Sequence, residues 1–71
     1  MHTHYAIIAP DGGIYETGAA REDHIPARCP AGHGWLRHDG TVTEGALPLR
    51  PDQIDPACIY AWRDGELIAV P

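Results

Sequence analysis

Four side chains that could bind a metal ion lie within a stretch of fifteen residues: His24, Cys29, His33 and His38, with Cys58 further along the chain. Imidazole and thiolate are ligands that suit zinc. The spacing is not that of a zinc knuckle, because the sequence has no Cys-x-x-Cys or Cys-x-x-His motif. A loop rich in proline and glycine accounts for these polar residues, so we expect no metal and no other cofactor. A zinc-binding adaptor built on Cys29, His33 and one or two of the others is the alternative.

A cysteine nucleophile would need a histidine and an orienting acid beside it. Cys29 has histidines nearby in the sequence, whereas Cys58 stands at the start of an apolar stretch and is typical of a core residue. A chain of 71 residues leaves little room for a ligand pocket of several hundred cubic ångströms. We therefore predict that the protein is not an enzyme and that it has no catalytic residues.

The charge pattern bears on the kind of partner. The net charge is −5 with neutral histidines, and the five arginines are scattered along the chain. Nucleic acids and anionic membranes both require a positive face, so neither is an expected partner. No basic leader or membrane-length apolar run is present, which predicts a soluble protein with reduced thiols and protein partners.

The elements that must position these residues are marked by three Asp-Gly pairs, at Asp11-Gly12, Asp39-Gly40 and Asp64-Gly65. Each lies between short runs of β-branched, aromatic or aliphatic residues, which is the pattern of a β-hairpin. We expect strands at 5–9 and 14–17, at 35–38 and 41–44, and at 59–63 and 66–70. The predicted fold is a single small all-β or mainly β domain over 1–71, made of three β-hairpins with a proline-rich connector.

Two segments between the hairpins contain too much proline for long regular elements. Residues 19–34 are expected to form a loop with one helical turn near 20–24. Residues 45–56 carry Pro48, Pro51 and Pro56 and are expected to form an extended connector. A 3₁₀ turn at 51–54 is predicted there, because proline suits the first position of such a turn.

The last hairpin has two apolar faces. A two-residue loop at Asp64-Gly65 places Trp62 opposite Leu67 and Tyr60 opposite Ala69 on one face, and leaves the other face to four aliphatic residues: Ile59, Ala61, Ile68 and Val70. A strand pair of this kind needs cover on both sides, which a small core does not readily supply. The surplus predicts a subunit interface. Five side chains are the expected anchors of the core or of that interface: Tyr15, Trp35, Tyr60, Trp62 and Leu67.

The outer segments carry a resemblance. The early segment is Tyr5-Ala6-Ile7-Ile8 followed by Asp11-Gly12-Gly13-Ile14-Tyr15-Glu16-Thr17-Gly18, and the last is Tyr60-Ala61-Trp62-Arg63-Asp64-Gly65-Glu66-Leu67 with Pro71. Together they resemble small proteins of tailed bacteriophages that are encoded among tail and tail-fibre genes. The resemblance covers somewhat under half of the chain and does not include the His and Cys cluster.

The resemblance implies a non-enzymatic virion component that decorates, caps or joins tail, tail-fibre, collar or capsid proteins. Its partners would be other virion proteins and itself, as a symmetric oligomer, and it would reside in the host cytoplasm before assembly. The size also favours association, since small domains usually gain stability from disulfides, metals or other chains. The alternative to a virion part and to the zinc adaptor is a phage-encoded inhibitor that binds a host protein as a monomer.

Overall fold

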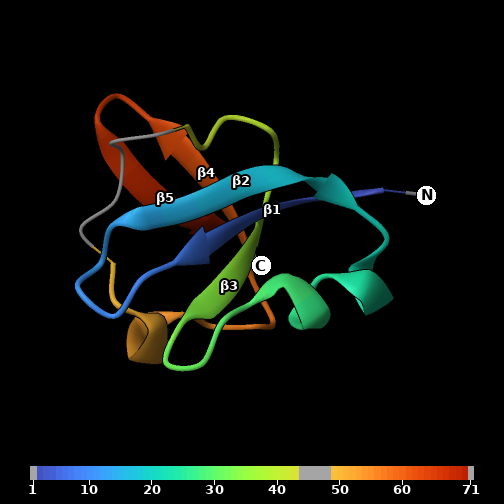
Figure 1. The fold of residues 1–71 in the computed structure, drawn as a ribbon. Helices are drawn as coiled ribbons and strands as arrows, with labels where there is room; N and C mark the ends of the chain where they lie inside the picture. The colour runs from blue at the N-terminus through green and yellow to red at the C-terminus, as the bar shows by residue number, and fades with distance from the viewer. Residues whose placement is uncertain (1, 44–48, 71) are drawn as a thin grey trace.

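The chain folds into a small, mainly β structure built on a five-stranded mixed sheet (Figure 1). The computed structural model describes residues 2–43 and 49–70. The strand order across the sheet is β2-β1-β3-β4-β5. The strands are β1 (Thr3–Ile8), β2 (Ile14–Ala20), β3 (Gly34–His38), β4 (Ile59–Arg63) and β5 (Glu66–Val70), and three 3₁₀ turns connect them: η1 (Glu22–His24), η2 (Pro26–Arg28) and η3 (Pro51–Gln53).

The first and last Asp-Gly pairs form the predicted hairpins. In the β1–β2 hairpin, the Asp11 carboxylate accepts a hydrogen bond from the Gly13 N–H at 2.9 Å, and a β-bulge leaves Tyr15 without a partner on β1. In the β4–β5 hairpin, Asp64 and Gly65 both adopt positive φ, at 52° and 76°, as a type I′ turn requires. Trp62 lies opposite Leu67 and Tyr60 opposite Ala69, so the predicted register is confirmed.

The prediction of a middle hairpin is wrong. Residues 41–43 belong to no strand, and position 44 lies outside the described residues. β3 instead pairs antiparallel with β1 and parallel with β4. Asp39-Gly40 does turn the chain, but the residues after it serve the core: Val42 is 3% exposed, and Thr41 accepts a hydrogen bond from the Trp62 N–H at 2.7 Å.

Both faces of the sheet carry apolar clusters, because side chains of β1 alternate between them. The first cluster contains Ala6, Ile8, Leu36, Val42 and Tyr60, with Ile54 of the connector packed against it. The second cluster contains Tyr5, Ile7, Ala20 and Ile25, with Cys29 and Trp35 packed against it. β1 is thus covered on both sides, and its Ile7 and Ile8 are fully buried.

Two of the 3₁₀ turns, η1 and η3, lie where the sequence predicts single turns. The prediction of a loop with one turn over 19–34 is otherwise incomplete, because β2 continues to Ala20 and η2 is a second turn. η1 and η2 flank Ile25, which is fully buried in the second cluster. η3 begins at Pro51 and is closed by the Gln53 side chain, which accepts a hydrogen bond from the Arg50 N–H at 2.9 Å. These turns leave Ile59, Ile68 and Val70 of the β4–β5 hairpin exposed.

Candidate interaction surface

Three large aliphatic side chains of the last hairpin are exposed on one face of the sheet. Ile59, Ile68 and Val70 are 46%, 41% and 45% exposed. The register places Ile59 beside Val70 and Ala61 beside Ile68, so the three share one face and are neighbours across β4 and β5. We call Ile59, Ile68 and Val70 the aliphatic patch. Contiguous exposed apolar side chains of this kind are typical of contact surfaces.

Arg37 forms the border between the patch and the covered part of this face. It lies next to Ile59 in the register of β3 and β4, and its guanidinium lies 4.9 Å from the centre of the Trp35 ring. The same guanidinium donates hydrogen bonds to the Glu22 carboxylate and to the Pro56 carbonyl. Arg37 therefore holds η1 and the end of the connector against β3, and the cover ends there.

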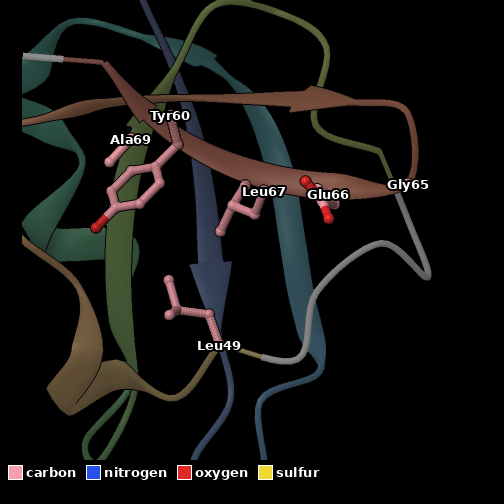
Figure 2. Close-up of a pocket in the computed structure, with 6 residues that line it drawn as sticks. All are labelled: Leu49, Tyr60, Gly65, Glu66, Leu67 and Ala69. Atoms are coloured by element: carbon pink, nitrogen blue, oxygen red, sulfur yellow. The ribbon is translucent and has the colours of Figure 1, made fainter.

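The opposite face of the hairpin carries a shallow pocket of about 410 Å³. Figure 2 shows Leu49 of the connector pointing towards Leu67 of β5, with the Tyr60 ring between the strands and the connector. The Tyr60 hydroxyl accepts a hydrogen bond from the Asp55 N–H at 2.9 Å. The pocket is lined by Leu49, Tyr60, Gly65, Glu66, Leu67 and Ala69. Apolar surface is therefore accessible on both faces of β5.

The outer side of β5 is open as well. β5 is the last strand of the sheet, and no described strand pairs with its outer side. In a two-residue hairpin the residues that flank the turn exchange hydrogen bonds, so Glu66, Ile68 and Val70 bond to β4. The N–H and C=O groups of Leu67 and Ala69 then point away from the sheet.

Four of the five predicted anchors pack against the two apolar clusters, and Tyr15 does not. Tyr60 is 6% exposed, and Trp62 and Leu67 are half-buried against the first cluster. Trp35 is half-buried against the second cluster, whereas Tyr15 is 57% exposed at the bulge, with the His33 ring 4.9 Å away. The aromatic face of the last hairpin thus packs inward, and its aliphatic face is the exposed one. The sequence signal for this aliphatic face is the alternation of Ile59, Ala61, Ile68 and Val70 with the residues of the aromatic face.

The His and Cys residues do not come together. His24 is exposed in η1, Cys29 packs against the second cluster and Cys58 against the first, on opposite faces of the sheet. Both cysteines are free. Within residues 2–43 and 49–70, no three His, Cys, Asp or Glu side chains are grouped as a metal site would require. Burial raises the pKa of both thiols, which keeps them protonated at neutral pH and makes them poor nucleophiles.

His38 is a structural histidine with both ring nitrogens occupied. The Gly40 N–H donates to Nδ1 at 3.0 Å, so Nε2 carries the proton and donates to the Tyr5 carbonyl at 3.1 Å. Burial lowers the pKa of His38; the Tyr5 carbonyl and Asp39 act in the opposite direction, and the stacked ring of His4 acts with the burial. A second proton would have to displace the Gly40 hydrogen bond.

This arrangement predicts loss of stability in mild acid. The pKa of His38 is lower in the folded chain than in the unfolded chain, where it is about 6.5. The stabilisation is therefore complete above that pH and declines as the pH falls from it towards the folded pKa. We expect a lower urea midpoint at pH 5 than at pH 7.5, and an NMR titration of His38 below the ordinary histidine pKa. A His38 pKa above the ordinary histidine value would contradict this. The control is His24→Gln, at an exposed position, which should show the same change of the urea midpoint with pH as the wild type.

Comparisons with protein-family models, with curated proteins and with solved structures find no match for this chain. No helix in the described part of the chain is long and apolar enough to cross a membrane. The physical features of the surface therefore carry the functional argument.

Proposed function

We propose that this protein is a non-enzymatic structural module that works by contacts with other protein chains and is present in several copies in a tailed-phage virion. The observation that carries the proposal is the open β4–β5 hairpin. Its aliphatic patch is more than 40% exposed at each of three positions, beside an edge strand without an outer partner in the described sheet. Full burial of an exposed side chain of this size contributes about 1.5–3 kcal/mol, and covering the part of each that is still exposed contributes roughly half of that, which favours a partner that covers the patch.

The remaining surface supports a protein partner. The net charge of −5 and the scattered arginines provide no basic face for nucleic acid. Arg37, Arg63 and Arg28 each lie beside a carboxylate of the same chain, which further reduces the positive charge available to phosphates. Apolar contact surface with few charges is the composition of an interface centre.

The virion setting is supported by the resemblance of the two outer segments to small phage tail proteins. Both of these segments fold as hairpins, and the β4–β5 segment carries the open surface. Multi-copy assembly suits a module with a small contact area, because linked copies raise the effective concentration of each contact.

The proposal is tested on purified particles of the phage or prophage that encodes the chain. Quantitative peptide mass spectrometry should find the chain in the particles at a symmetric copy number relative to the major tail or capsid protein. A chain found only in the lysate of infected cells, bound there to a host protein, would contradict the virion role and favour the inhibitor. The control is a phage enzyme that is expressed in the same infection and washes away from particles.

A further inference from the structure

We propose that β5 pairs with β5 of a second copy, antiparallel about a two-fold axis, and so joins two five-stranded sheets into one. The inference rests on the proposed function, because it names the partner surface of the multi-copy module. The backbone N–H and C=O groups of Leu67 and Ala69, which point away from β4, are the groups that a second copy would bond. An open antiparallel edge is complementary to itself, since each copy offers the same alternation of N–H and C=O groups.

The β5 edge lacks the features that normally prevent such pairing. Natural edge strands are protected by lysine, proline, bulges or inward charges. Glu66–Val70 contains no lysine and no proline, and its pairing with β4 has no bulge. Its one charged residue, Glu66, lies at the end next to the turn. The opposite edge differs: β2 has a bulge at Tyr15, and its Glu16 lies 3.7 Å from Arg28. The two edges of the sheet are thus unequal, and β5 is the open one.

A pairing centred on Ile68 uses every outward group. Leu67 then lies opposite the partner's Ala69 and exchanges both backbone hydrogen bonds with it, and the reverse pair does the same. Ile68 lies opposite the partner's Ile68 in a close pair that is not hydrogen-bonded, with Cα atoms about 4.5 Å apart. Part of each aliphatic patch is covered by the other.

The charges permit this register. Glu66 lies opposite the partner's Val70, so the two Glu66 carboxylates are offset by four residues, roughly 13 Å along the strands. On the other face, the side chains of Leu67 and Ala69 bring the two pockets side by side across the junction. No like charges on β5 face each other, which removes a common obstacle to edge pairing.

The area sets the expected strength. Five residues span about 17 Å, and an edge-to-edge contact adds to this length only the side chains that flank the two strands, so the buried area stays below the ~1,200 Å² of stable interfaces. The dimer should therefore be weak and dependent on concentration. It should also stop at two copies, because the sheet of the described residues has one open edge of this kind and a two-fold contact closes on itself.

Ala69→Pro tests the pairing directly. Proline removes the outward N–H of Ala69, which is not bonded to β4, and edge strands tolerate proline at such a position. Native mass spectrometry and sedimentation velocity from about 1 μM to 1 mM should show a metal-free dimer of the wild type, in the affinity range of weak contacts. Because both copies carry the substitution, the dimer loses two hydrogen bonds, and the dissociation constant should rise at least about tenfold, the equivalent of 1.4 kcal/mol.

Ala31→Pro is the matched control. Ala31 precedes Gly32, whose φ is 79°, and the His33 N–H donates to the Pro30 carbonyl at 3.1 Å. This is a type II turn, in which proline is favoured at the position of Ala31. The control should keep the wild-type dimer. A wild type that stays monomeric throughout, or a dimer that Ala69→Pro leaves unchanged, would overturn the pairing.

Amide hydrogen exchange keeps the test independent of the folding of the variant. In the wild type, exchange at Leu67 and Ala69 should slow as the concentration rises, whereas exchange at Ala31 should not change. If the exchange rates at Leu67 and Ala69 do not change with concentration, the inference is overturned. A monomer that is nonetheless incorporated in particles overturns the pairing alone, and a β5 dimer of a chain that is absent from particles overturns the virion role alone.

Discussion

Leu36→Ala is expected to destabilise the fold by about 2–5 kcal/mol, the usual effect of truncating a buried leucine. Leu36 is 1% exposed and lies on β3, the central strand of the sheet. It packs in the first cluster with Ala6, Ile8 and Tyr60, where the structure has little means of filling the space left by the lost side chain. A domain of this length has a free energy of unfolding of roughly 4–10 kcal/mol, so the loss is a large fraction of the total.

Urea unfolding monitored by the fluorescence of Trp35 and Trp62 measures this effect, at a concentration low enough to avoid association. Ile68→Ala is the matched control, because it also removes an aliphatic side chain but at a position that is 41% exposed. We expect the control to lose less than about 1.5 kcal/mol, since the side chain is incompletely buried in the single chain. Equal losses in the two variants would contradict the packing of β3 described above.

Gly34→Ala is expected to destabilise the fold by about 1–3 kcal/mol, although only a methyl group is added. A Cβ at Gly34 would lie 2.9 Å from Pro51 Cβ, 3.2 Å from Pro51 Cα and 3.2 Å from Ile54 Cδ1. Pro51 is held in η3, and Ile54 packs against the first cluster. The added methyl group must therefore displace the connector from the sheet, which loosens the cover of the core.

Gly13→Ala is the control for backbone effects. A Cβ there meets a flexible side-chain atom, Asp11 Oδ1, at 3.3 Å, and glycine-to-alanine changes at compatible positions stabilise by about 0.4–1 kcal/mol through the unfolded chain. Thermal unfolding should place the midpoint of Gly13→Ala near the wild-type value and that of Gly34→Ala well below it. If the two variants melt together, Pro51 does not pack on Gly34 as described.

The open hairpin connects the fold to the proposed role. Arg37 ends the cover on one face by holding Glu22 and Pro56, and on the other face Leu49 of the connector lines the pocket together with Leu67. Ile59, Ile68 and Val70 of the β4–β5 hairpin stay exposed, while unbroken pairing with β4 keeps β5 a regular strand. A regular, uncovered strand offers a partner a preformed surface, which lowers the entropy cost of binding.

Several parts of this protein depend only on neighbouring residues, and these could be predicted from the sequence. The outer hairpins follow from Asp11-Gly12 and Asp64-Gly65, because turn geometry selects the pairing of the strands on either side. The turns at 22–24 and 51–53 follow from the short polar segment and from proline at a first helical position. The alternation of Ile59 and Val70 with Tyr60 and Ala69 likewise specifies two apolar faces.

How these parts are combined depends on tertiary contacts. Asp39-Gly40 has the same local chemistry as the other turns, yet β3 pairs with β1 and β4, since pairing on both sides and burial of Val42 in the core outweigh a local hairpin. Which face of the last hairpin is exposed also depends on where η1, η2 and the connector end, and those ends are set by contacts between residues far apart in the chain, such as Arg37 with Pro56. Local turn chemistry acts over a few residues, whereas burial depends on the whole sheet. For this reason the sequence indicates two apolar faces of the hairpin, and only the packing of the sheet determines that the aliphatic one is exposed.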